Sequence, residues 1–174
     1  LKDIKKKNID RLIILDEGGR CLENMPGNAA LSYPIAAIEQ TRGGLYSETT
    51  GMLPFPLIEV ATCTAKKILE PPLIAIAVIR RIKEVLRKLN LDQDITFGVI
   101  GNGVIGNAIC HYLISLGYNV CVFDQEKAAF QGIVSRHLFR MENISEVLTI
   151  ADVVIGCTGK DITAGIDIPA VIKK

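Results

Sequence analysis

Apolar runs and segments with helical spacing alternate along the second half of the chain. The runs have the length of single buried strands, and the segments between them place apolar residues on one face of a helix. Strands that alternate with helices are typical of a parallel sheet covered by helices. The predicted strands lie at residues 95–100, 120–123 and 153–155, and the predicted helices at residues 107–116, 126–132 and 144–150. The predicted fold class is therefore α/β, with a Rossmann-like doubly wound parallel sheet.

The first half of the chain predicts a smaller, partial α/β segment. Its predicted strands lie at residues 12–15 and 57–60, and its predicted helices at residues 31–41, 63–69 and 73–89. The pair Pro71-Pro72 is expected to stop the second of these helices, because a residue before proline disfavours helical backbone.

A Gly-x-Gly-x-x-Gly motif follows the first strand of the second half and opens its helix. Its residues are Gly101, Asn102, Gly103, Val104, Ile105 and Gly106. The first glycine permits a tight turn, the second lets the backbone approach a pyrophosphate, and the third lets the helix pack closely on the sheet. The start of the helix offers N–H groups and a positive dipole end to phosphates. The motif in this context predicts a dinucleotide site.

An acid at the end of the next strand indicates which dinucleotide binds. Asp124 follows the run 120–123, and a carboxylate at this place accepts hydrogen bonds from the ribose hydroxyls of NAD. The next strand, 153–155, ends in Gly156 and then in Cys157, Thr158 and Gly159, small residues that suit a loop close to the nicotinamide. NAD is therefore the predicted cofactor.

Composition and charge narrow the class of protein. The chain is 49% hydrophobic, 22% charged and has a net charge of +1, so neither nucleic acid nor an anionic membrane is an expected partner. Glycines, prolines and charges interrupt the apolar stretches, so no membrane span is expected. The five cysteines include no C-x-x-C pair, which favours a reducing cytoplasm. His111 and His137 lack metal-ligand spacing, so no metal is expected.

The upstream segments resemble the S-adenosylhomocysteine hydrolase family. They are Ile14 to Gly19, Thr41 to Gly43, Glu48 to Gly51, and Lys66 with Glu70, followed by the glycine motif, Asp124, and Cys157 to Gly159 with Asp161. The resemblance implies a homo-oligomer that uses NAD to oxidise and eliminate on a nucleoside-like substrate, in one-carbon metabolism. It implies that Thr49 and Thr50 bind the cofactor. It also implies catalytic roles for Glu17 as a substrate acid, Lys66 as a proton acceptor and Glu70 as a ligand of sugar hydroxyls.

The chain departs from that family at several places. Ser47 stands where the family has a substrate-binding glutamate, Glu48 replaces a threonine, and Pro71 replaces an asparagine. Neither histidine of the chain matches a family catalytic histidine. We therefore expect no hydrolysis of S-adenosylhomocysteine by these 174 residues alone. An NAD-dependent enzyme and a non-catalytic NAD-binding sensor or scaffold both fit the sequence. A dehydrogenase of another Rossmann family fits less well, because of the segment from Arg42 to Gly51.

The proline pair and the resemblance together predict two domains. Residues 1–60 are expected to be a remnant of a substrate-type domain, and residues 61–174 an NAD-binding Rossmann domain. Fewer strands follow Gly101 than a doubly wound nucleotide domain contains, and the chain begins with Leu1. We therefore expect a fragment, or a protein shortened at both ends, with the nucleotide domain truncated at its C-terminus.

Overall fold

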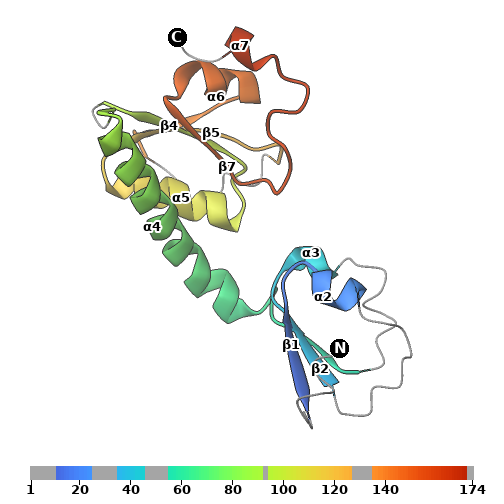
Figure 1. The fold of residues 1–174 in the computed structure, drawn as a ribbon. Helices are drawn as coiled ribbons and strands as arrows, with labels where there is room; N and C mark the ends of the chain where they lie inside the picture. The colour runs from blue at the N-terminus through green and yellow to red at the C-terminus, as the bar shows by residue number, and fades with distance from the viewer. Residues whose placement is uncertain (1–10, 25–34, 46–54, 92–93, 127–134, 172–174) are drawn as a thin grey trace. The chain divides into compact units, whose positions relative to one another are not determined.

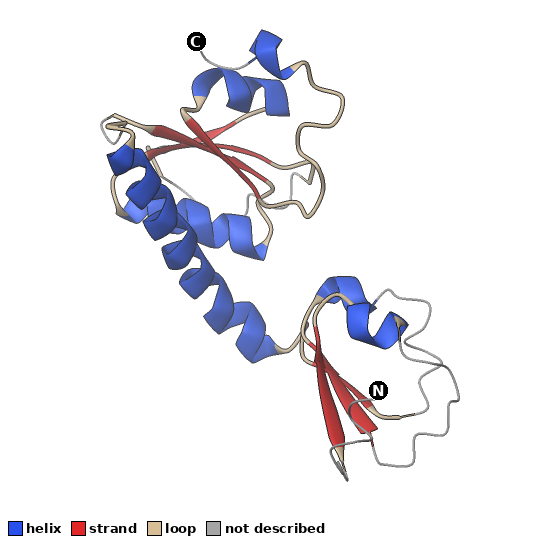
Figure 2. Ribbon diagram, viewed as in Figure 1, coloured by secondary structure: helices blue, strands red, loops and turns tan. Residues whose placement is uncertain are grey.

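A computed structural model describes residues 11–24, 35–45, 55–91, 94–126 and 135–171 (Figures 1 and 2). The chain divides into two compact units, Leu1–Lys67 and Ile68–Lys174. Each unit contains its own parallel sheet. The boundary lies inside a helix, beyond the predicted boundary after residue 60, and the predicted roles of the two domains stay predictions.

The first unit is built on a three-stranded parallel sheet. Its strands β1 (Leu12–Asp16), β2 (Ile35–Glu39) and β3 (Leu57–Glu59) lie in the order β1-β2-β3. The short helices α2 (Arg20–Glu23) and α3 (Arg42–Leu45) follow the first two strands. The register aligns the last residues of the strands, because Asp16 pairs with Glu39 and Glu39 pairs with Glu59. Three carboxylates therefore form a row at the carboxyl end of this sheet.

Residues 35–39 are a strand, so the helix predicted for residues 31–41 is wrong in this part; residues 31–34 lie outside the described residues. A five-residue apolar run has no periodicity that separates a buried strand from a helix turn. Pairing with β1 on one side and β3 on the other decides the matter, since it satisfies the backbone on both edges. The strands predicted at residues 12–15 and 57–60 are confirmed as β1 and β3.

The second unit contains a four-stranded parallel sheet with helices on both faces. Its strands are β4 (Thr96–Ile100), β5 (Asn119–Phe123), β6 (Leu138–Arg140) and β7 (Val153–Gly156), in the order β6-β5-β4-β7. Helices α4 (Thr64–Lys88) and α5 (Val104–Ser115) lie on one face, and α6 (Ile144–Ile150) lies on the other; α7 (Ile168–Val171) ends the unit (Figure 1). The predicted α/β fold with a Rossmann-like parallel sheet is thus confirmed.

Two apolar cores hold these layers together. Ile79 of α4 and Leu113 of α5 are fully buried with Phe97 and Val99 of β4 on one face of the sheet. On the other face, Val147 of α6 packs with side chains from β4 and β5. The predicted helix at 144–150 is confirmed, whereas the helix predicted at 126–132 falls largely outside the described residues.

Helix α4 runs without interruption from Thr64 to Lys88, so the predicted stop at Pro71-Pro72 is wrong. The two prolines lack the N–H groups that would bond to the carbonyls of Lys67 and Ile68. The side chains of both of these residues are exposed, so water can reach this part of the helix. The lost bonds are therefore partly replaced, and burial of the next turns, at Ala75 and Ile79, favours continuation of the helix.

Candidate cofactor-binding site

The turn between β4 and α5 brings the ends of three strands together. Gly101 follows β4, and its N–H donates a hydrogen bond to the carbonyl of Phe123, the last residue of β5 (2.8 Å). Cys157, just after β7, donates to the carbonyl of Ile100 (2.7 Å). The glycine motif, the acid after β5 and the loop after β7 therefore lie at one carboxyl edge of the sheet, where ligands of open α/β sheets bind.

Gly101 must be glycine for two reasons. Its φ of +96° lies in the left-handed region that other residues rarely adopt. A Cβ at this position would lie 2.9 Å from Cγ2 of Thr158 and 3.0 Å from the carbonyl carbon of Cys157. The loop after β7 therefore packs directly on the turn, and no side chain fits between them.

Gly106 lets the first turn of α5 lie against the glycine turn. A Cβ there would lie 1.9 Å from the carbonyl oxygen of Gly101 and 3.3 Å from Cβ of Cys157. Both contacts are closer than atoms normally approach, and one of them is with backbone. The role predicted for the third glycine, close packing of helix on sheet, agrees with this geometry.

Gly103 differs from its two neighbours in the motif. Its φ of −65° and ψ of −167° are open to ordinary residues, and a Cβ there would meet no atom within 4 Å. The first bond inside α5 runs from the N–H of Asn107 to the carbonyl of Gly103 (2.8 Å), so the N–H groups of Val104, Ile105 and Gly106 precede the helical ladder. Open space in front of these N–H groups suits a phosphate.

The carboxylate of Asp124 lies beside this turn. One oxygen, Oδ2, accepts a hydrogen bond from the N–H of Asn102, and Oδ1 accepts from the N–H of Glu126 (2.8 Å). A carboxylate offers about four acceptor sites, so these two bonds orient Asp124 and leave capacity for ligand hydroxyls. The geometry fits the two hydroxyls of an adenosine ribose.

The loop after β7 is tightly turned but carries polar groups. The hydroxyl of Thr158 bonds to the N–H and the carbonyl of Lys160 (3.1 Å each), and Gly159 has a φ of +69°. Burial raises the pKa of the Cys157 thiol. Burial and the nearby Cys157 raise the pKa of Cys110 to about 12. Both thiols are therefore protonated at neutral pH, and their role here is packing.

The residues predicted to be catalytic are divided between the two units. Glu17 is exposed in the loop after β1, and Lys66 lies in the first turn of α4, where its ammonium donates a hydrogen bond to the carbonyl of Gln40. Glu70 belongs to the second unit. Thr49 and Thr50 lie outside the described residues. No shared site for these five residues is described.

Sequence reasoning missed a buried carboxylate that organises the loop of Glu17. Glu39 at the end of β2 is 0% exposed and accepts hydrogen bonds from the N–H groups of Gly18 (3.2 Å), Gly19 (3.0 Å) and Thr41 (2.7 Å) and from the Thr41 hydroxyl (2.8 Å). Burial alone would raise the pKa of Glu39, but the bonds from Thr41, Gly18 and Gly19 together lower it. An acid at the end of an apolar run was the signal for this residue.

Asp16, at the end of β1, has a similar task. Its carboxylate accepts hydrogen bonds from the N–H groups of Glu17 (2.8 Å), Cys21 (3.1 Å) and Leu22 (2.9 Å). It thereby satisfies donors at the start of α2, as capping acids do. The Asp16-Glu17-Gly18-Gly19 segment is thus held by two buried acids, while Glu17 itself stays exposed.

Metal sites and membrane spans lack support in the part of the chain that the structure describes. Among these residues, no three histidine, cysteine, aspartate or glutamate side chains are grouped as metal ligands. None of the described helices has the length and apolarity that crossing a bilayer requires.

Comparisons with known proteins agree with the geometry of the second unit. Residues 96–171 match the family model described as the NAD binding domain of 6-phosphogluconate dehydrogenase. An uncharacterized protein of Mycobacterium tuberculosis is 31% identical over 150 residues, which are 86% of this chain and 27% of that protein.

Solved structures show the same fold at low identity. One chain of the dipicolinate synthase from Bacillus halodurans aligns with a TM-score of 0.64 and 13% identity over 99% of this chain and 63% of that one. The pyruvate reductase of Chlamydomonas reinhardtii aligns with a TM-score of 0.51 and 14% identity over 91% of this chain and 51% of that one. The chain thus spans less than two thirds of the length of each of these relatives.

These findings define the second unit at the level of the domain. They support the NAD-binding part of the sequence interpretation, whereas the specific resemblance to S-adenosylhomocysteine hydrolase stays a prediction. The predicted cofactor, NAD, is confirmed by the family match. Residues 96–171 are therefore an NAD-binding domain of the Rossmann type, related to those of dehydrogenases.

Proposed function

We propose that the chain is the cofactor-binding part of an NAD-dependent enzyme that moves a hydride between the nicotinamide and a hydroxyl-bearing carbon of a small substrate. The observation that carries this proposal is the arrangement around the glycine turn. Open space at Gly103, the start of α5 and the oriented carboxylate of Asp124 lie at one edge of the sheet. NAD, when bound, supplies hydride transfer; the chain binds and orients it.

Each part of the site has a separate task in this proposal. The N–H groups of Val104, Ile105 and Gly106 receive the pyrophosphate, and Asp124 receives the ribose hydroxyls. Cys157, Thr158 and Gly159 line the nicotinamide end, where close backbone restricts water. The side chains of Val104 (58% exposed) and Ile105 (41% exposed) stand uncovered at this mouth and would be covered in part by the dinucleotide.

The substrate side of the proposal rests on the family resemblance. Residues 1–60 would then belong to a substrate-type domain, with a nucleoside-like substrate contacted by Glu17 and Glu70. Lys66 would accept the hydroxyl proton as hydride leaves, and Thr49 and Thr50 would contact the cofactor. A cytoplasmic location and a homo-oligomer belong to the same proposal.

One observation favours the second candidate, a non-catalytic NAD-binding protein. The ammonium of Lys66 bonds to the carbonyl of Gln40 and so joins the start of α4 to the end of β2. A lysine engaged in this way can be structural. The two candidates differ in one measurable event, which is reduction of bound NAD by a substrate.

Lys66→Met is expected to abolish reduction of bound NAD by substrate while leaving NAD affinity unchanged. Methionine keeps much of the side-chain volume but cannot accept a proton. The measurement is NADH absorbance after the NAD-loaded protein, as expressed from its gene, is mixed with adenosine, S-adenosylhomocysteine or 2-hydroxy acids. Lys67→Met, at the exposed neighbouring position, is the matched control.

Three outcomes separate the candidates. Loss of reduction in Lys66→Met alone supports Lys66 as the base. Reduction at the wild-type rate in Lys66→Met rejects Lys66 and leaves the hydride-transfer proposal standing. If the wild-type protein reduces NAD with none of these substrate classes, the non-catalytic candidate replaces the enzyme.

Asp124 is expected to decide the choice between NAD and NADP. Its carboxylate accepts ribose hydroxyls and repels a 2′-phosphate, and the residues that follow, Gln125 and Glu126, offer no positive charge. NAD should therefore bind at least about tenfold more tightly than NADP, a difference of about 1.4 kcal/mol. Calorimetric titration of both nucleotides into the wild-type protein and Asp124→Asn measures this preference.

The asparagine variant keeps the shape of the side chain and removes its charge. It should bind NADP and NAD with more nearly equal affinity. Equal affinities already in the wild-type protein would contradict the role of Asp124.

A further inference from the structure

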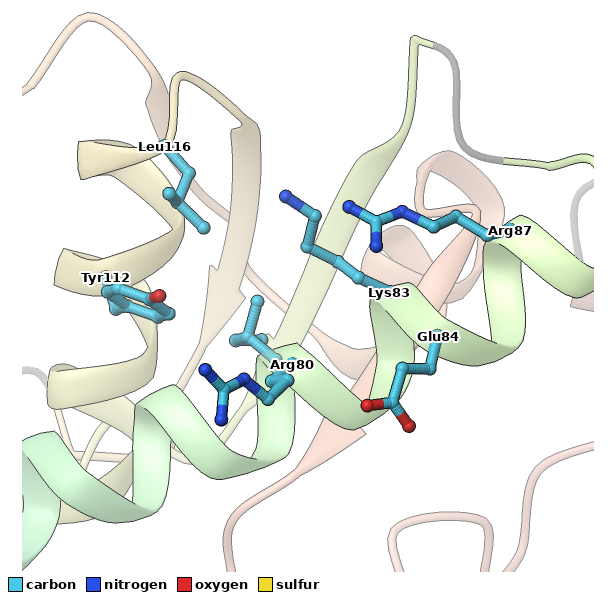
Figure 3. A pocket seen from close by; sticks show the side chains of 7 residues that line it. Arg80, Lys83, Glu84, Arg87, Tyr112 and Leu116 are labelled. Atoms are coloured by element: carbon cyan, nitrogen blue, oxygen red, sulfur yellow. The ribbon is translucent and has the colours of Figure 1, made fainter.

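A pocket separate from the glycine turn lies between α4 and α5 (Figure 3). Its volume is 280 Å³, and its lining comes from the second half of α4 and the last turn of α5. The lining residues are Ile79, Arg80, Lys83, Glu84, Arg87, Tyr112 and Leu116. This volume is close to the lower end of the range for small-molecule sites, roughly 300 Å³.

Three cations line the α4 side of this pocket. Arg80, Lys83 and Arg87 follow one another at spacings of three and four residues, so they share one face of the helix. Figure 3 shows their side chains extending from α4 around the same space. Like charges at these spacings destabilise a helix unless an opposite charge is near. The sequence of α4 therefore places positive charge here against its own helical preference.

The neighbouring groups leave most of this charge uncompensated. Glu84 is the acid of the lining, but its carboxylate accepts from the guanidinium of Arg81 at 2.8 Å. The ammonium of Lys83 lies 5.7 Å from the centre of the Tyr118 ring, a contact that does not neutralise it. Neither Arg80 nor Arg87 forms an ion pair with any residue that the structure describes.

The helix ends nearby do not supply the missing counter-charge. The C-terminal ends of α4 and α5 each contribute about half a negative charge. Together they offset about one of the three cationic charges. A net positive site remains, and it would attract an anion.

The opposite wall has a different character. Ile79 is fully buried at the base, while Leu116 and the ring of Tyr112 come from α5. An apolar wall facing two guanidinium groups suits a small molecule with an anionic group and an apolar part. Guanidinium groups bind phosphate with paired hydrogen bonds. A phosphomonoester carries about −1.5 to −2 charges at pH 7, which matches the remaining positive charge better than one carboxylate does.

We propose that the pocket between α4 and α5 is a second ligand site, which binds the phosphate group of a small phosphorylated molecule through Arg80 and Arg87. Lys83 adds to the positive potential, and Tyr112 and Leu116 contact the remainder of the ligand. The site is distinct from the dinucleotide site, because it lies along the last turn of α5 whereas the pyrophosphate belongs at the first turn.

The test is calorimetric titration of pyrophosphate into the protein saturated with NAD, so that the glycine turn is already occupied. The double variant Arg80→Gln/Arg87→Gln removes both guanidinium groups from the pocket. Lys67→Gln/Lys88→Gln is the matched control, since it removes two exposed cations from the same helix outside the pocket. The arginine pair should weaken binding by about tenfold or more, and the control pair by less than about threefold. Circular dichroism and thermal unfolding check that each variant is folded.

Every outcome of this experiment bears on the proposal. Loss of binding in the arginine variant alone supports the site. Equal weakening in both variants would mean that diffuse surface charge attracts the anion, and the site would be rejected. Absence of millimolar binding by the wild-type protein would also reject it, as would binding of an acidic peptide but not of pyrophosphate. If the arginine variant is unfolded, Tyr112→Phe and Arg87→Lys repeat the comparison, and unchanged affinity in both would overturn the proposal.

Discussion

Gly103→Val is expected to abolish NAD binding while the protein stays folded. The backbone at Gly103 has a φ of −65°, which valine adopts without strain, and a Cβ there meets no atom within 4 Å. The added side chain would stand in the open space that the pyrophosphate requires at the start of α5. We expect NAD affinity to fall by about a hundredfold or more, which corresponds to about 2.7 kcal/mol.

Calorimetry measures the affinity, and urea unfolding measures the stability of the same samples. Gly43→Val is a suitable control, because Gly43 belongs to α3 in the first unit and also leaves open space for a Cβ. A folded Gly103→Val protein that binds NAD as tightly as the wild type would show that the cofactor is not held at this turn.

Gly106→Ala is expected to act in the opposite way, by destabilising the second unit. One methyl group would lie 1.9 Å from the carbonyl oxygen of Gly101 and 3.3 Å from Cβ of Cys157. Relief requires α5 to move away from β4, and this movement opens the core around Ile109 and Leu113. Overpacking of this kind costs about 1–3 kcal/mol or more.

Urea unfolding of Gly106→Ala and Gly103→Ala makes the comparison sharp. The two variants receive the same methyl group, three residues apart in one motif, and only the first should lose stability. An unfolding midpoint for Gly106→Ala equal to that of Gly103→Ala would mean that α5 does not rest on the turn as described. Loss of binding and loss of stability would thus be assigned to different glycines.

Local pattern was sufficient for the architecture of the second unit. The strands β4, β5 and β7 coincide with uninterrupted apolar runs, because a parallel strand covered on both faces must be apolar on both sides. The glycine motif and Asp124 were also readable, since each glycine is required by backbone geometry within a few residues. Strand β6 was not predicted, and its three residues carry little pattern.

Pattern failed where distant partners decide the conformation. Residues 35–39 resemble a helix turn as much as a strand, and their pairing with β1 and β3 makes them a strand. Helix α4 passes through Pro71 and Pro72 because packing of the following turns outweighs the bonds that the prolines remove. In both cases the deciding contacts involve segments far away in the sequence.

The sequence by itself determined the fold class of the second unit, its glycine turn and its cofactor, because each depends on residue types at short, fixed spacing. Only the tertiary structure decided that Glu39 and Asp16 clamp the loop of Glu17, since strand register aligns acids that lie far apart in the chain. It likewise decided that Gly106 serves packing whereas Gly103 borders open space, and that the cations of α4 face the last turn of α5. These are properties of distances between elements, and no local periodicity encodes such distances.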